Sequence, residues 1–455
     1  MKKFIYHSSL FVLFICLTFS VFIQTTYYHF NPSNVKYNIK LISSNEYEGR
    51  LTGTCGNEKV ASLIENFFKN NKILPFNNSY KESFEVTTPI KNNKTPELKI
   101  AKNNTPLHEY QYGVDFKEDM LNFNENSVVF TKQDTVDILP SSLVIKHNDK
   151  RYLFYVSLNK DFSFRSSFND DAPYEFSIAI TTELFNDILD SLRSDKEIIV
   201  TIPYSEEKCI TSNIIGKIKG SSKDLPPLIL TAHFDHIGVD NLDNYYNGAL
   251  DNASGTAFLL ELSKNLSSFM KPKRDIIFVA LTGEEFGLLG SSHFTNEYKD
   301  LIKNSNVINF DMIGAPNTPI SLMSGSCNKD NGSELLDSLK EICDKKNIDY
   351  KITFADCSDH ASFAKEGIDS VTLCHSDTSK IHTPNDTVEF IDTSAINEVY
   401  SIVEDEIYNY AYNDFILFLY NPNLILFLFI AFIIVFFFPT FKKKLKVYIN
   451  KKKLK

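Results

Sequence analysis

The sequence has 455 residues, which suits one large domain with an insertion better than a single average domain. Its hydrophobic content of 43% is ordinary for a globular protein, which argues against intrinsic disorder. Of the 47 Lys and Arg residues, 2 lie at the start and 8 follow Phe441, which leaves 37 against all 57 Asp and Glu residues. The middle of the chain therefore carries a formal charge of about −20, which disfavours nucleic acid or anionic lipid as its partner.

Residues 1–27 are predicted to be an N-terminal signal-anchor, that is, a transmembrane segment. An apolar run of about 20 residues follows Lys2 and Lys3, and this is long enough to span a bilayer. The sequence FIQT at residues 22–25 offers no small-residue cleavage site. An uncleaved anchor is therefore favoured over a cleaved signal peptide.

Residues 28–84 are interpreted as the first part of the main domain, and residues 85–205 as a β-rich insertion. Helical apolar spacing predicts a helix over Asn57–Lys69. In the insertion, β-branched and aromatic runs predict strands such as Ser127–Thr131 and Tyr152–Ser157, whereas the asparagine-rich stretch Lys91–Thr105 is predicted to be an exposed loop. No pattern typical of chemistry is visible in the insertion.

Residues 206–412 show alternating strand and helix patterns. Short apolar runs predict strands at Leu228–Ala232, Ile276–Leu281, Val307–Phe310 and Val371–Cys374, and Ala257–Leu266 is predicted to be a helix. This alternation predicts an α/β fold with a mixed, mostly parallel sheet flanked by helices. Functional residues in such sheets gather just beyond the carboxyl ends of the strands.

Residues 413–440 are predicted to form a second transmembrane segment, followed by a basic tail at residues 441–455. The apolar run is interrupted at residues 421–423 and becomes extremely apolar over Leu424–Phe438. A buried core helix is the alternative, but the lysine cluster beside the run is typical of the cytoplasmic side of a membrane. Both termini are therefore expected in the cytoplasm of a membrane-anchored protein, with the middle extracytoplasmic.

The seven cysteines show no C-x-x-C spacing, and six of them lie outside the predicted membrane segments. Disulfides are permitted in an extracytoplasmic domain, and Cys357 with Cys374 is a candidate pair. Free buried thiols are the equally weighted alternative.

Residues with metal-ligand chemistry follow several of the predicted strands or lie in nearby turns. Taken singly, each has an explanation that needs no metal, such as a hydrogen-bonded histidine, a helix-capping aspartate or a solvated glutamate pair. Together they are harder to dismiss, because converging carboxylates repel one another unless a dication compensates them. The residues of this kind are His233, Asp235, Asp251, Glu284, Glu285, Asp311 and His382.

The motifs around these residues are HFDHIG, NGALDNASG, LTGEEFGLLGS, NFDMIG and IHTPNDT. In order, they resemble the zinc aminopeptidases of metallopeptidase family 28, in clan MH. The resemblance covers about Ile214–Ile391, with a weaker echo in EYEGRLTGT. It implies a zinc-peptidase, phosphorylase/hydrolase-like fold, formed by residues 28–84 and the catalytic core 206–412. A protease-associated domain is the usual insertion in this family, and the segments SIAITTELFNDIL and EIIVTIP resemble parts of one.

The resemblance implies two Zn²⁺ ions per chain. Asp251 would bridge the two ions, with His233 and Asp311 completing the protein ligands of the first, and Glu285 and His382 those of the second. Imidazole and carboxylate are suitable ligands for zinc, and three protein ligands per ion leave room for water.

The family pattern also implies roles for residues that are not ligands. Glu284 would be the general base, and Asp235 would accept the second N–H of the ligand histidine two residues earlier. His360 would support the active site without binding metal. His236 is expected to point elsewhere.

The resemblance implies a zinc-dependent exopeptidase that removes N-terminal residues from peptides. A carboxypeptidase is one alternative, and it would require cationic groups for the substrate carboxylate, for which Arg50 and Arg274 are candidates. A glutaminyl cyclase is another, although such enzymes usually use one zinc, and the complete pair of His233 and Asp311 argues against it. Co²⁺ or Mn²⁺ could occupy the same ligands.

Overall fold

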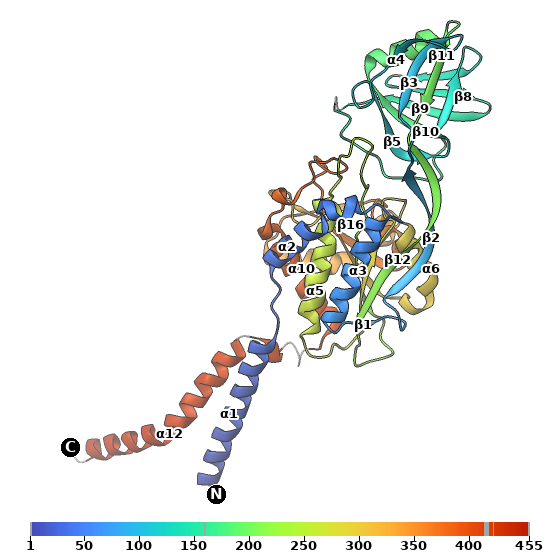
Figure 1. Cartoon of the computed structure of the whole chain (residues 1–455). Coiled ribbons are helices and arrows are strands. Elements are labelled where there is room, and N and C mark those ends of the chain that lie inside the picture. Colours follow the sequence, from blue (N-terminus) through green and yellow to red (C-terminus); the bar gives the residue numbers. More distant parts are fainter. Residues whose placement is uncertain (1, 159–160, 414–417, 422, 454–455) are drawn as a thin grey trace.

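The computed structural model describes residues 2–158, 161–413, 418–421 and 423–453. It has three parts: an α/β body, a β-rich lobe on one side of it and two long terminal helices on the other (Figure 1). Some predicted segments lie partly outside the described residues. These gaps are residue 1 of the first anchor, 159–160 of the insertion, 414–417 and 422 of the C-terminal segment, and 454–455 of the tail.

The body is built on a sheet whose strands follow the order β1-β12-β14-β13-β15-β18-β16-β17, with β2 also paired to β12. The four neighbours β14, β13, β15 and β18 run parallel, and antiparallel pairings lie on both sides of them. The strands of this sheet are β1 (Leu74–Pro75), β2 (Lys81–Lys91), β12 (Tyr204–Ile218), β13 (Leu228–His233), β14 (Ile276–Leu281), β15 (Asn306–Asp311), β16 (Ile320–Ser324), β17 (Tyr350–Phe354) and β18 (Asp369–His375).

Helices cover both faces of this sheet, because alternate residues of each central strand point to opposite sides. Leu230 packs in the larger apolar core and its neighbour Ile229 in the smaller one. The larger core contains residues of α2 (Pro32–Ile42), α3 (Cys55–Asn70), α5 (Gly255–Ser267), α8 (Glu334–Lys346) and α10 (Thr393–Ala411), and the smaller one residues of α6 (Leu289–Ile302) and α9 (His360–Lys365). The mixed sheet flanked by helices that was expected from the sequence is confirmed.

The lobe is joined to the body by a long antiparallel ribbon, in which β12 pairs with β2 from Tyr204↔Lys91 to Ile214↔Lys81. It contains two sheets, β5-β10-β9-β8-β7 and β4-β3-β11-β6, around one apolar core. Its elements are β3 (Glu97–Lys102), β4 (Thr105–Glu109), β5 (Phe116–Phe123), β6 (Ser127–Phe130), β7 (Thr135–Leu139), β8 (Ser142–His147), β9 (Lys150–Val156), β10 (Phe176–Ile180), α4 (Thr182–Leu192) and β11 (Glu197–Thr201). The expected insertion boundaries, 85 and 205, both fall within the ribbon.

The prediction of an exposed loop in the asparagine-rich stretch of the lobe is wrong in part. Within Lys91–Thr105 the chain forms β3, because Leu98 and Ile100 point inward and are only 0% and 5% exposed. The surrounding asparagines and lysines concealed this short alternation. The proposed pairing of Cys357 with Cys374 is also not formed, since all seven cysteines are free thiols.

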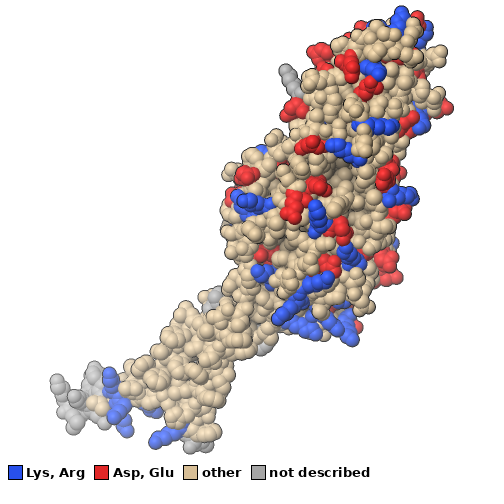
Figure 2. Space-filling model, in the orientation of Figure 1, with Lys and Arg blue, Asp and Glu red and all other residues tan. Residues whose placement is uncertain are grey.

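The terminal helices α1 (Lys2–Thr26) and α12 (Asn423–Lys453) are long and apolar enough to cross a membrane. They lie side by side (Figure 1), and the rings of Phe14 and Phe432 are 6.5 Å apart. In Figure 2 the visible face of this helix pair is free of charge until its tip, where lysines gather. Two such helices suggest that the protein associates with a membrane.

Candidate metal centre

The parallel central strands bring most of the predicted site residues to one edge of the sheet. His233 and Asp311 are the last residues of β13 and β15, and Glu284 and Glu285 follow β14 in the next turn. Asp251 lies in the short π-helical segment η2 (Ala249–Ser254) before α5. Because neighbouring parallel strands end at the same edge, residues far apart in the sequence meet there.

The first group of potential metal ligands consists of His233, Asp251 and Asp311. His233 Nε2 lies 3.5 Å from Asp251 Oδ1 and 3.5 Å from Asp311 Oδ1. All three residues are buried, and neither His233 Nε2 nor Asp311 Oδ1 has a hydrogen-bond partner.

The second group uses the other oxygen of Asp251. His382 Nε2 lies 3.4 Å from Asp251 Oδ2 and 3.3 Å from Glu285 Oε1. His382 comes from the loop after β18, so the structure brings all five predicted ligands together. Each oxygen of Asp251 therefore faces one group.

His236 also lies in the second group, and the expectation that it points elsewhere is wrong. Its Nδ1 is 3.0 Å from Glu285 Oε1 and 3.8 Å from Asp251 Oδ2. The ring is packed closely against Gly248, where an added Cβ would lie 2.5 Å from it. Gly248 also has a positive φ of 52°, so the glycine of the NGALD motif was a signal for this close approach.

The donor set fits zinc. Imidazole nitrogens and carboxylate oxygens are the usual protein ligands of this ion in hydrolytic sites. Burying such atoms without partners is costly, and a cation between them would remove that cost. The unpartnered nitrogen of His233 and oxygen of Asp311 are the clearest examples.

Within the second group, the charged side chains shift one another's pKa values. Although burial opposes ionisation, the imidazole of His382 holds the pKa of Glu285 well below its usual range. Burial disfavours a charged His382, yet the carboxylates of Glu285 and Asp251 raise its pKa to about 11.

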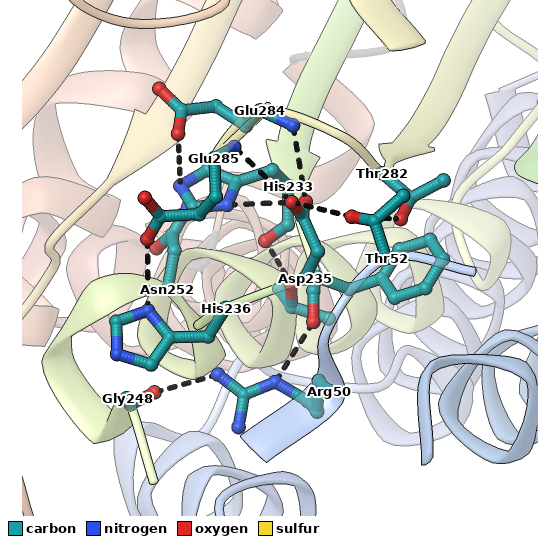
Figure 3. Close-up of polar contacts among 12 residues, drawn as sticks. Arg50, Thr52, His233, Asp235, His236, Gly248, Asn252, Thr282, Glu284 and Glu285 are labelled. Atoms are coloured by element: carbon teal, nitrogen blue, oxygen red, sulfur yellow. Dashed lines mark hydrogen bonds and ion pairs between the residues drawn. The ribbon is translucent and has the colours of Figure 1, made fainter. Parts of the chain in front are cut away.

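Glu284 differs from its neighbour, because burial raises its pKa well above the usual value. Its Oε2 lies 4.0 Å from His233 Nε2 (Figure 3). The side chain is 13% exposed. A carboxyl group that holds its proton more firmly than usual, beside potential metal ligands, suits proton exchange.

Asp235 connects the end of β13 to the turn after β14 through polar contacts. Its Oδ2 accepts hydrogen bonds from Thr52 Oγ1 at 3.0 Å and from the backbone N–H of Glu285 at 3.2 Å (Figure 3). Its Oδ1 lies 3.5 Å from His233 Nδ1. This is the place from which a carboxylate orients an imidazole whose other nitrogen binds metal.

Arg50 is a supporting residue whose role the sequence did not indicate. Its buried guanidinium donates to the carbonyl oxygens of Phe234, Asn247 and Gly248 at 2.6–2.9 Å, and to that of Ile42 at 3.2 Å. It thereby fixes the HFDH and NGALD loops against each other (Figure 3). The only available signal was its place in the EYEGRLTGT echo.

Two more supporting residues are Asp386 and Ser358, which lies two residues before His360. The carboxylate of Asp386, in IHTPNDT, accepts the backbone N–H groups of Leu250 and Asp251 at 2.8 and 3.0 Å. Ser358 donates to Asp311 Oδ2 at 2.7 Å. His360 itself faces away from the ligands, and its ring nitrogens contact the Ala355 carbonyl oxygen and the Thr372 hydroxyl.

A buried cluster of histidines and carboxylates at the carboxyl edge of an α/β sheet, beside a glutamate of raised pKa, is the arrangement of a metal-dependent hydrolase. Residues 213–407 match the model of Peptidase family M28. This match covers the part of the chain that contains the candidate metal centre, and it makes that part similar to the family.

Curated relatives agree with this assignment. The chain is 30% identical to the aminopeptidase YwaD of Bacillus subtilis over 208 residues, which cover 44% of each protein. It is 42% identical to a vacuolar membrane protease of Candida glabrata over 85 residues, or 19% of this chain and 8% of the relative. The chain thus spans less than half the length of the curated relatives it matches.

Solved structures share the fold at low sequence identity. An aminopeptidase from Aneurinibacillus sp. strain AM-1 matches with a TM-score of 0.61 and 18% identity, over 84% of this chain and 94% of that one. A zinc aminopeptidase from Bacillus subtilis matches with a TM-score of 0.57 and 18% identity, over 85% and 96%. The residues outside the insertion make up less than these fractions of the chain, so the matches include at least part of the insertion.

Proposed function

We propose that the protein is a zinc-dependent aminopeptidase that binds two Zn²⁺ ions and removes N-terminal residues from peptides. The observation that carries the proposal is the position of Asp251, whose two oxygens face two separate groups of buried imidazoles and carboxylates. Zinc is also named in a solved structure that shares this fold.

In the proposed reaction, Glu284 acts as the general base. Zinc at the two groups would supply a Lewis acid that polarises the scissile carbonyl and makes water more acidic. Glu284 would accept a proton from the attacking water at a carboxylate oxygen and return it to the leaving amine nitrogen. Asp235 would hold the imidazole of His233 in one orientation throughout.

The charge around the site favours an aminopeptidase over a carboxypeptidase. A carboxypeptidase needs a free cation for the substrate carboxylate, but the guanidinium of Arg50 is occupied by four backbone carbonyl oxygens. Arg274 bonds instead to the carbonyl oxygens of Tyr410 and Pro226, beside the amino-terminal ends of the central strands. Carboxylates therefore dominate the charge of the site, and they would attract the free ammonium of a peptide N-terminus.

A panel of fluorogenic peptides tests this proposal. The panel contains aminoacyl substrates, the same substrates with acetylated N-termini, and peptides with a free C-terminus as the only cleavable end. We expect cleavage of the free-amine substrates alone, loss of activity with a chelator and recovery with Zn²⁺. Cleavage that requires a free C-terminus would replace the proposal by a carboxypeptidase.

We further propose that both termini lie in the cytoplasm and the peptidase domain outside. The lysines at residues 2–3 and in the tail after Phe441 support this orientation, because lysines beside apolar segments favour the cytoplasmic side. Protease added to intact cells should digest the peptidase domain and spare a C-terminal tag. Removal of the tag under those conditions would refute the orientation.

A further inference from the structure

One segment of the insertion, residues 162–168 (FSFRSSF), reaches the candidate metal centre. We name it the strap. The lobe holds it from one side, since Lys117 Nζ on β5 donates to the carbonyl oxygen of Phe162 at 2.9 Å. Asp119 on the same strand accepts hydrogen bonds from the backbone N–H and the hydroxyl of Ser166, at 2.8 and 2.7 Å. The strap is therefore an ordered part of the lobe rather than a loose loop.

The strap contacts both residues that complete the second ligand group. Arg165 and His382 make two hydrogen bonds: the Arg165 N–H donates to the His382 carbonyl oxygen at 3.1 Å, and His382 Nδ1 lies 3.1 Å from the Arg165 carbonyl oxygen. Ser167 Oγ donates to Glu285 Oε2 at 2.5 Å. Phe164 stacks on the imidazole of His382, with ring centroids 5.8 Å apart.

These contacts determine which atoms are available to a metal. A carbonyl oxygen only accepts hydrogen bonds, so the contact with Arg165 requires the proton of His382 on Nδ1. Nε2, which faces Asp251 and Glu285, is then the nitrogen that would give up its proton and present a lone pair to zinc. In the same way, Ser167 occupies Oε2 of Glu285 and leaves Oε1 directed into the ligand group.

The backbone of His382 also needs such support. Its φ of 57° lies in the left-handed region, which costs free energy for a residue with a side chain. The pair of hydrogen bonds to Arg165 holds it there. Arg165 is itself fixed, because its buried guanidinium donates to the Ile237 carbonyl oxygen at 2.8 Å and lies over the rings of Tyr204 and Tyr246.

We infer that the strap is a positioning element of the metal centre, through which the insertion sets the orientation of His382 and Glu285 for zinc. The inference rests on the proposed zinc binding and deepens it. The strap would touch neither the substrate's reacting atoms nor the ion; it acts through two ligands. The insertion and the peptidase domain would accordingly form one functional unit, and weakening the strap would lower zinc affinity first.

The test compares three variants of the full-length protein in detergent or lipid. Ser167→Ala removes the hydroxyl from Glu285, Ser167→Thr keeps a hydroxyl, and Ser163→Ala makes the same change in the strap at a residue that does not contact the ligands. Zinc affinity is measured by competition with a chromophoric chelator, independently of activity. Thermal unfolding of the metal-free proteins reports on folding.

We expect Ser167→Ala to weaken zinc binding about tenfold, the lower end of the range for residues that orient metal ligands. Ser167→Thr should restore most of the affinity, Ser163→Ala should match the wild type, and the metal-free proteins should unfold at similar temperatures. As a second variant, Asp119→Ala should weaken zinc binding without touching a ligand, because it releases the strap from the lobe.

Two other results would overturn the inference in distinguishable ways. If the wild type binds zinc tightly and Ser167→Ala binds it equally well, the strap does not position the ligands, while the proposed function stands. If the wild type binds no zinc, the proposed function fails and the inference fails with it.

Discussion

The peptidase domain and the joint between it and the insertion both bury charged side chains, but they compensate the charge differently. At the joint, Lys117 and Asp240 form an ion pair of 2.6 Å, with side chains 2% and 0% exposed. At the metal centre, His233 Nε2 and Asp311 Oδ1 are buried without hydrogen-bond partners. The Lys117–Asp240 pair is complete within the chain itself, whereas the metal centre would be completed by the proposed cation. The paired charges at the joint therefore have a structural role, whereas the unpartnered groups at the metal centre indicate where the chemistry takes place.

The largest effect is expected at the proposed base. Glu284→Gln removes the proton acceptor but keeps the size of the side chain, so activity should fall by about 10²–10⁴-fold. Zinc content, measured by elemental analysis, should not change. Glu207→Gln is the control, because Glu207 is exposed on β12. Full activity of Glu284→Gln would exclude the base assignment.

Removing a proposed ligand should affect metal and activity together. His382→Ala deletes the imidazole that faces Asp251 and Glu285, and zinc affinity should fall by more than the roughly 10–100-fold expected for residues that only orient ligands. His108→Ala, at an exposed histidine of the lobe, is the matched control. Unchanged zinc content in His382→Ala would give the ligand role to His236 instead.

A third prediction concerns the paired charge at the joint. Lys117→Met leaves the buried carboxylate of Asp240 without its cation, which should lower the free energy of unfolding by about 3–5 kcal/mol. The control pair Lys146–Asp137 is exposed, so Lys146→Met should cost less than about 1 kcal/mol. Denaturant unfolding measures both. The double variant Lys117→Met with Asp240→Asn should recover most of the lost free energy of unfolding. If Lys117→Met and Lys146→Met lose the same free energy, the contrast between buried and exposed pairs is wrong.

The smallest effect is expected in the ribbon between the two regions. Burial raises the pKa of Glu82 from 4.5 to about 7, although a hydrogen bond from Asn213 opposes the shift. Between these values the unfolded chain ionises while the folded chain keeps its proton, so stability falls as pH rises and levels off above about 7. Glu82→Gln should reduce this decline by about 1–3 kcal/mol, measured by unfolding from pH 4.5 to 8. Identical pH dependence in the variant and the wild type would contradict the shift.

The central sheet and the meeting of the five predicted ligands were accessible from the sequence. Short apolar runs predicted β13, β14, β15 and β18, and polar motifs followed directly after three of them. Parallel strands bring their carboxyl ends together, so local patterns were enough to predict a shared site.

Other parts of the site depend on contacts that no local pattern indicates. The strap holds His382 through the backbone oxygen of Arg165, an atom that every residue has. Arg50 is an arginine whose partners are all carbonyl oxygens distant in the sequence. From the sequence, His236 was only a residue close to a ligand. Its ring lies in the site, where it packs closely against Gly248.

The most direct test of the account is a titration of the metal-free, full-length protein with Zn²⁺. Bound metal and cleavage of a free-amine peptide are followed together. We expect activity to reach its plateau at two equivalents of zinc per chain. A plateau at one equivalent, or activity that does not depend on added metal, would contradict the two-ion site built around Asp251.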